Sequence, residues 1–194
     1  MSKRGLNRQV VVEAAVSCIE TRGYENFSMR ELADLLEVKT ASLYNHIESI
    51  EALYGESARF AITKLNDAMR TATEGKERDA AVHALAAAYF HFAKEHPELY
   101  KVIMSCPKQK DASLLAASGE IINQILAVLS GYRLSEIQKM HMQRVLRSIL
   151  HGFVSQRDSG YFHYFTVNAL ESFHIAVDCL LEGIHRMEEE ESNK

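Results

Sequence analysis

The chain has 194 residues, of which 47% are hydrophobic and 25% are charged, so it can bury the core of one large domain or two small ones. With only two prolines and nine glycines, it does not fit the collagen-like, linker-rich or β-sandwich classes. Its formal net charge of −4 gives no overall basic balance of the kind that indicates nucleic-acid binding.

Apolar residues recur at the spacing of an amphipathic helix along the whole chain, which predicts an all-α fold of about nine helices. Ser28, with Glu31 three residues later, has the spacing of a capping box, and Ser135 with Gln138 repeats it. In the first part of the chain, helices are expected around residues 11–22, 28–36, 40–47 and 49–73. Further helices are expected at residues 79–94, 97–103, 114–129, 135–157 and 165–187.

Glu74–Lys76 is the clearest break between helices, and it divides the chain into two domains. We expect an N-terminal domain at residues 1–50, a connecting helix at about 49–73 and a C-terminal domain at 74–194. The like-charge run Glu188–Glu191 is expected to be a frayed, solvated tail.

The most informative segment is residues 10–47, where three short helices and a tight turn match a helix-turn-helix. Leu43 and Ile47, four residues apart, are expected to bury one face of the third helix. Its other faces then carry side chains that can reach base edges or phosphates, namely Thr40, Ser42, Tyr44, Asn45 and His46. Tyr44 has an alternative interpretation as a core aromatic residue.

The run FSMRELADLLEVKTASLYNHIESIEAL at residues 27–53 resembles the helix-turn-helix of TetR-type transcriptional regulators, and the likeness covers about residues 8–54. The resemblance implies that Ser28 and Arg30 face phosphate, and that Tyr44 and His46 hold the DNA backbone. It also implies that bases are read by a set from the third helix, namely Lys39, Thr40, Ala41, Ser42 and Asn45.

Two residues depart from the family pattern. Glu37 stands where the family usually has a turn glycine, and a left-handed conformation there costs a non-glycine residue roughly 1 kcal/mol. Ile50 stands where the family usually has a lysine, so a common phosphate contact is missing. Residues 1–47 carry six basic and six acidic side chains. Lys3, Arg4 and Arg8 are therefore either a basic arm toward DNA or part of a solvated tail.

The run SILHGFVSQRDSGYF at residues 148–162 resembles a C-terminal motif of one TetR subfamily, which is usually marked by Trp and then His-Gly. In that architecture the last two long helices pair with their copies in a four-helix dimer interface. Two adjacent apolar helices also need a covering partner on physical grounds. The expected interface residues are Leu146, Leu150, Leu170, Phe173, Val177, Leu180, Leu181 and Ile184.

The aromatic and methionine residues of the C-terminal part are either core or the lining of an apolar ligand pocket. The candidates for the pocket are Phe90, Tyr100, Met104, Met142, His151 and Phe153. The nine histidines include no recognised metal-ligand spacing, so we expect neither a metal nor a cofactor. Cys106, beside Pro107 in an expected turn, is either a redox-sensing thiol or an inert surface cysteine.

The sequence lacks nucleotide-binding and hydrolase motifs, so we expect no enzyme. It also lacks an apolar leader, a membrane-length apolar run and a disulfide framework, so a cytoplasmic protein without membrane contact is expected. The resemblance implies a homodimeric, ligand-responsive repressor that binds a palindromic operator in double-stranded DNA. Two alternatives stay open: a ligand-binding or protein-interaction module that has lost DNA binding, and a helical enzyme with an incidental motif.

Overall fold

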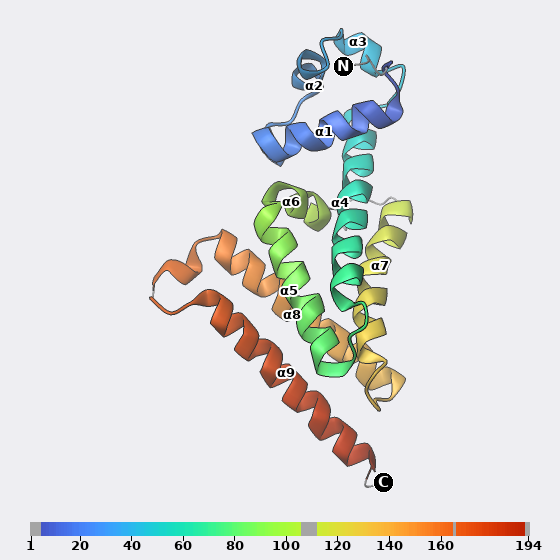
Figure 1. The fold of residues 1–194 in the computed structure, drawn as a ribbon. Helices are drawn as coiled ribbons and strands as arrows, with labels where there is room; N and C mark the ends of the chain where they lie inside the picture. Colours follow the sequence, from blue (N-terminus) through green and yellow to red (C-terminus); the bar gives the residue numbers. More distant parts are fainter. Residues whose placement is uncertain (1–4, 106–111, 165, 193–194) are drawn as a thin grey trace. The chain divides into compact units, whose positions relative to one another are not determined.

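The computed structural model describes residues 5–105, 112–164 and 166–192, and over these residues the chain is helical without β-strands (Figure 1). This confirms the predicted all-α fold. The α-helices are α1 Arg8–Arg22, α2 Met29–Leu35, α3 Thr40–Leu43, α4 Ile50–Thr73, α5 Arg78–Glu95, α6 Pro97–Ser105, α7 Ala112–Leu129, α8 Glu136–Asp158 and α9 Ala169–Ser192. Two short 3₁₀ turns complete the described part, η1 at Tyr24–Asn26 and η3 at Tyr161–Tyr164.

The helices form two compact units. The first unit comprises residues 1–64 and 95–118, and the second comprises residues 65–94 and 119–194. The chain therefore passes between the units within α4, at the junction of α5 and α6, and within α7.

The first unit is built around α1. Asn7 caps this helix by accepting the backbone N–H of Val10 at 3.0 Å, and Gly23, with φ of 93°, ends it. The Glu98 carboxylate of α6 accepts the backbone N–H of Tyr24 at 2.7 Å and so holds the chain directly after α1. The core of this unit is apolar and includes Val11, Ala15, Ile19, Leu32, Leu43 and Leu53, which are fully buried.

The second unit is organised by the packing of α8 against α9. Phe173 of α9 is fully buried, and its ring centre lies 4.9 Å from that of Phe90 and 5.4 Å from that of Phe153. The inner row of α8 repeats every four residues and consists of Met142, Leu146, Leu150 and Val154.

The helix boundaries correct several predictions. α9 begins at Ala169, where the Asn168 side chain accepts the N–H of Leu170 at 2.9 Å, instead of at Phe165, which lies outside the described residues. It continues to Ser192, so the predicted fraying at 188–191 was wrong, and of these four residues only Glu189–Glu191 are exposed as expected. The expected turn at Cys106 and Pro107 also lies outside the described residues.

Glu188 explains why the end of α9 is ordered. It is only 6% exposed, and its carboxylate accepts the Arg78 guanidinium at 2.7 Å and the backbone N–H of Arg133 at 2.7 Å. The hydrogen bond from Arg78 lowers the pKa of the Glu188 carboxyl, although burial acts in the opposite direction. These contacts tie α9 to the start of α5 and to the loop before α8.

A second polar contact lies beside the first. The Asp79 carboxylate accepts the Tyr132 hydroxyl at 2.7 Å and lies 2.9 Å from the His185 ring. Burial, together with the hydrogen bond to Asp79, raises the pKa of the Tyr132 hydroxyl. The C-terminal half of α9 is thus held by polar side chains where a sequence reading finds only a charged tail.

We predict that Glu188→Gln lowers the free energy of unfolding by about 1.5–3 kcal/mol at pH 7, because it removes the charge from the acceptor of the hydrogen bonds that Arg78 and the backbone of Arg133 donate. The folded-state pKa of Glu188 is depressed, so its contribution is present above the unfolded pKa of about 4.3 and is lost as pH falls through the folded value. Urea unfolding of both proteins at pH 7 and pH 4 should show the difference shrinking at pH 4. Glu189→Gln, at an exposed neighbouring position, should have no measurable effect at either pH. An equal loss in both variants would contradict the assignment.

Candidate nucleic-acid interface

The second helix of the first unit begins at Ser28. The Ser28 hydroxyl accepts the backbone N–H of Glu31 at 3.3 Å, which confirms the predicted N-cap. The Glu31 carboxylate accepts the hydroxyl of Ser28 at 3.0 Å, in place of the backbone N–H that a full capping box uses. The predicted capping box is complete at Ser135 instead.

The turn between α2 and α3 is a Schellman motif. The backbone N–H of Val38 donates to Ala33 at 3.0 Å, and that of Glu37 donates to Asp34 at 3.2 Å. Glu37 occupies the left-handed position of this motif, with φ of 54°, where glycine is the preferred residue. The turn therefore keeps the geometry that glycine normally provides, at the cost of strain at Glu37.

The third helix is anchored by two apolar residues. Leu43 is fully buried and Ile47 is 3% exposed, as their spacing predicted. Regular helix covers only Thr40–Leu43, which is shorter than predicted, and the backbone continues as a turn in which Ile47 still donates to Leu43 at 3.1 Å. The anchored face leaves the opposite face of α3 and its turn toward solvent.

None of the predicted DNA-contacting side chains is buried. Tyr44 is 52% exposed, which excludes its alternative interpretation as a core residue of the isolated chain. The set divides into exposed residues, Arg30, Lys39, Ala41, Tyr44 and Asn45, and half-buried residues, Ser28, Thr40, Ser42 and His46. All nine lie in the first unit, on or next to α2 and α3, and they carry hydroxyl, amide, imidazole and basic groups.

Of the three residues of the predicted basic arm, only Arg8 is described by the structure, and it is paired with a carboxylate. Lys3 and Arg4 lie outside the described residues. Arg8 begins α1, and its guanidinium donates to Glu56 of α4 at 2.9 Å. Burial raises the pKa of the Glu56 carboxyl, but hydrogen bonds from Arg59 and Arg8 outweigh it, so that the pKa is lowered. Arg8 is thus paired with a carboxylate inside the first unit. One of the two expectations was that it would belong to a free basic arm directed toward DNA.

The six predicted ligand-binding residues are divided between the two units. Tyr100 and Met104 lie on α6 in the first unit, whereas the other four lie in the second unit. Phe90 and Phe153 both contact Phe173, as part of the apolar packing of the second unit. The remaining two are Met142, which is buried, and His151, which is exposed.

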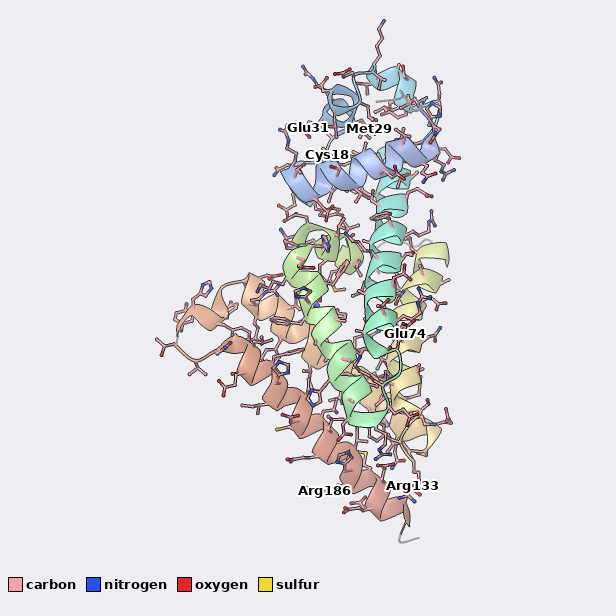
Figure 2. All side chains as sticks on the ribbon, in the orientation of Figure 1. Cys18, Met29, Glu31, Glu74, Arg133 and Arg186 are labelled. Atoms are coloured by element: carbon pink, nitrogen blue, oxygen red, sulfur yellow. The ribbon has the colours of Figure 1, made fainter. Side chains whose placement is uncertain are left out.

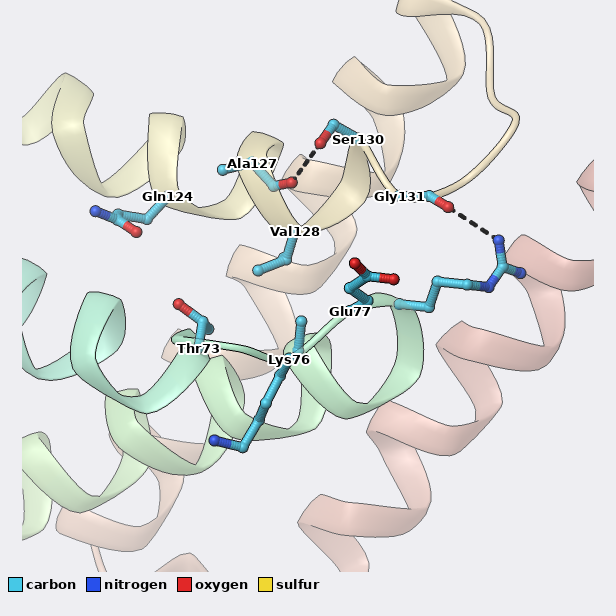
Figure 3. Close-up of a pocket in the computed structure, with 10 residues that line it drawn as sticks. Thr73, Lys76, Glu77, Gln124, Ala127, Val128, Ser130 and Gly131 are labelled. Carbon is cyan, nitrogen blue, oxygen red and sulfur yellow. Dashed lines mark hydrogen bonds between the residues drawn. The ribbon is translucent and has the colours of Figure 1, made fainter.

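A hollow of about 470 Å³ lies in the second unit between the end of α4, the start of α5 and the end of α7 (Figure 3). Much of its polar lining already has partners: Lys76 donates to Ala72 at 2.7 Å, and the carbonyl of Gly131 accepts Arg78 at 2.9 Å. None of the predicted ligand-binding residues lines this hollow. It is therefore a poor match to the predicted apolar pocket.

A second hollow, also of about 470 Å³, runs along the outer face of α8. Its lining is mostly apolar and consists of Arg144, Val145, Ser148, Ile149, Gly152, Phe153 and Gln156. The broad apolar stripe of the sequence at residues 142–154 thus contains two rows, of which one packs inside and the other lines this groove. The apolar groove residues Val145, Ile149 and Phe153 belong to this stripe, but the sequence did not distinguish the two rows.

Most of the predicted dimer contacts on α8 and α9 are buried within a single chain. Seven of the eight residues are at most 7% exposed within a single chain, so they have almost no surface left to bury against a partner. They are Leu146, Leu150, Phe173, Val177, Leu180, Leu181 and Ile184. Leu170, at 43% exposed, is the exception. The outer groove residues, which the prediction did not list, have the free surface that an interface requires.

Among the described residues, no group of three His, Cys, Asp or Glu side chains is arranged to hold a metal ion. No described helix combines the length and apolar character that crossing a bilayer requires. The predicted DNA-contacting residues on and next to α2 and α3 remain the candidate site. Figure 2 draws the side chains of this part of the chain, with Met29 and Glu31 of α2 labelled.

Comparisons with known protein families match both parts of the chain. Residues 11–56 match the family model for bacterial regulatory proteins of the tetR family. Residues 82–180 match the model for the tetracyclin repressor-like C-terminal domain.

Two relatives are described as uncharacterized HTH-type transcriptional regulators. YobS of Bacillus subtilis is 34% identical over 79% of this chain and 80% of its own length. Rv0681 of Mycobacterium tuberculosis is 32% identical over 77% of this chain and 69% of its own length.

Solved structures share the fold at lower sequence identity. A protein with unknown function from Rhodococcus is 21% identical with a TM-score of 0.82, covering 94% of this chain and 97% of its own. The TetR regulator SCO7222 from Streptomyces coelicolor is 17% identical with a TM-score of 0.76, covering 94% of this chain and 99% of its own.

We predict that Glu37→Gly stabilises the protein by about 1 kcal/mol, because glycine adopts the left-handed conformation at this position without strain. Thermal or urea unfolding measures the change. Glu37→Gln keeps the strain and removes only the charge, so its stability should stay close to that of the unmodified chain. If both variants gained stability equally, charge repulsion and not backbone strain would be the cause.

Proposed function

Because the chain belongs to the TetR family of DNA-binding transcriptional regulators, we propose that it is a ligand-responsive repressor that binds a palindromic operator as a homodimer. The observation that carries this proposal is the anchored third helix: Leu43 and Ile47 are buried while Asn45 and Tyr44 stay exposed. A major groove accepts one helix per half-site, and the exposed groups there can donate to and accept from base edges.

DNA contact by this surface separates into two roles. Thr40, Ser42 and Asn45 carry short hydroxyl and amide groups suited to base edges. Tyr44 and His46, with Ser28 and Arg30, are suited to phosphates. Because acidic and basic side chains balance in residues 1–47, the affinity has to come from these directed contacts more than from overall charge.

The dimer is supported by the outer groove of α8. Val145 is 42% exposed and lies with Ile149 and Phe153 along one face of the helix. Apolar area of this kind on a long helix gains free energy when a second copy covers it. Two-fold symmetry would place two third helices on one duplex, which requires half-sites separated by roughly 34 Å or a multiple of it.

The response to a ligand is proposed to pass through α4, which starts in the first unit and ends in the second. A small molecule bound in the second unit would favour another setting of this helix and so change the separation of the two reading surfaces. A coupling free energy of about 1–3 kcal/mol would alter DNA affinity about 5–150-fold.

The direct test is a gel shift of the purified chain on DNA from upstream of its own gene, at low and at physiological salt. We expect a retarded band that an unlabelled copy of the same DNA removes at lower concentration than a scrambled sequence does. A folded protein with no band at low salt would favour the alternative module that has lost DNA binding.

We predict that Asn45→Ala reduces the preference for operator over scrambled DNA, because the amide is placed to read a base, with a loss of about 1–3 kcal/mol. Fluorescence anisotropy on both DNA sequences measures the ratio. Tyr44→Phe is the contrast: without its hydroxyl, binding should weaken by a similar factor on both sequences. Equal effects of Asn45→Ala on the two sequences would contradict base reading by this residue.

We predict that Val145→Glu shifts the chain from dimer to monomer, because dimerisation would then bury a carboxylate in an apolar groove. Sedimentation velocity measures the change. Leu115→Glu, which places the same charge at an exposed apolar residue of α7, should leave the dimer intact. A Val145→Glu variant that sediments as the unmodified protein would exclude this face of α8 as the interface.

A further inference from the structure

Gln143 is a polar side chain inside the second unit. It is 3% exposed on α8, and its Oε1 atom is buried without a hydrogen-bond partner among the described residues. Its neighbours on the helix, Met142 and Leu146, are buried and apolar. The side chain thus presents an unpaired acceptor to an apolar interior.

Unpaired buried acceptors are rare in folded proteins, and each one needs an explanation. The described residues contain four buried side-chain atoms of this kind, and three belong to the second unit, on Asn66, Gln143 and Arg157. Asn66 of α4 also lacks a partner for its amide oxygen. Three of these four unpaired atoms thus lie in the unit that is proposed to sense a ligand.

We propose that Gln143 determines the specificity of the effector site, by accepting a hydrogen bond from a hydroxyl or neutral N–H group on an otherwise apolar molecule. This proposal rests on the function proposed above. Gln143 is uncharged, so it can satisfy a neutral donor, whereas a buried cation would need a countercharge. A site with an unpaired acceptor rejects a ligand of the same shape that lacks the donor, because the acceptor then stays unpaired.

The proposal has a consequence that needs no ligand. Replacing Gln143 by methionine keeps the size of the side chain and removes the unpaired oxygen. The empty protein should therefore melt about 3 °C or more higher than the unmodified chain. Gln143→Leu, a second apolar replacement, should also melt higher. A lower melting temperature in both variants would overturn the proposal, because it would mean that the amide already stabilises the fold.

Ligand selectivity is tested with phenol and toluene, which are nearly the same shape and differ in one hydroxyl group. Isothermal titration or thermal-shift titration of the full chain measures both dissociation constants. We expect phenol to bind the unmodified protein at least about fivefold more tightly than toluene. In Gln143→Met the preference should disappear or reverse.

Asn123→Leu is the matched control, since it removes an exposed amide from α7. It should keep both the phenol preference and the melting temperature. An equal phenol-to-toluene ratio in the unmodified protein and in Gln143→Met would overturn the proposal. The gel shift of the unmodified chain separates the two hypotheses: a protein that binds its operator but shows no such contrast overturns only the role of Gln143.

Discussion

The reversal of the chain at Glu37 determines where the third helix lies. Two backbone hydrogen bonds, from Val38 to Ala33 and from Glu37 to Asp34, close the end of α2 in a conformation that requires a left-handed residue. Leu43 and Ile47 then meet the core of the first unit, and their burial fixes which face of α3 stays outside. The exposure of Asn45 and Tyr44 is a consequence of this packing, and the strain at Glu37 is offset by it.

The second unit depends on a different constraint, the width of the apolar stripe on α8. A helix that packs on one side needs an apolar arc of about 100°. In α8 the row through Leu146 and Leu150 fills that need, and the row through Val145 and Ile149 lies outside it. The excess apolar surface costs free energy in an isolated chain. This cost is removed when a second copy of the chain covers the apolar surface, which is the physical basis of the proposed dimer.

The sequence predicted what depends on local spacing and capping. The helix starts at Ser28 and Ser135 follow from local hydrogen bonds, and the buried pair Leu43 and Ile47 follows from helical periodicity. It did not predict what depends on distant partners. Glu188 reads as part of an acidic tail until Arg78, more than a hundred residues earlier, is seen to bind it. Likewise, periodicity marks the apolar residues of α8 and α9 but does not tell which of them face their own chain and which face a partner.

The partners of buried polar groups also could not be predicted from the sequence. They show how the proposed sensing unit differs from a purely apolar core. Glu188 and Asp79 are buried or half-buried with full sets of partners, so they hold the end of α9 in place. Gln143 is more deeply buried than either, yet its oxygen has no partner. A fold selected only for stability would place an apolar residue there, since the same volume without the oxygen packs as well. The buried, unpaired oxygen of Gln143 is explained when a molecule outside the chain supplies the donor, which is the physical basis of the proposed effector contact.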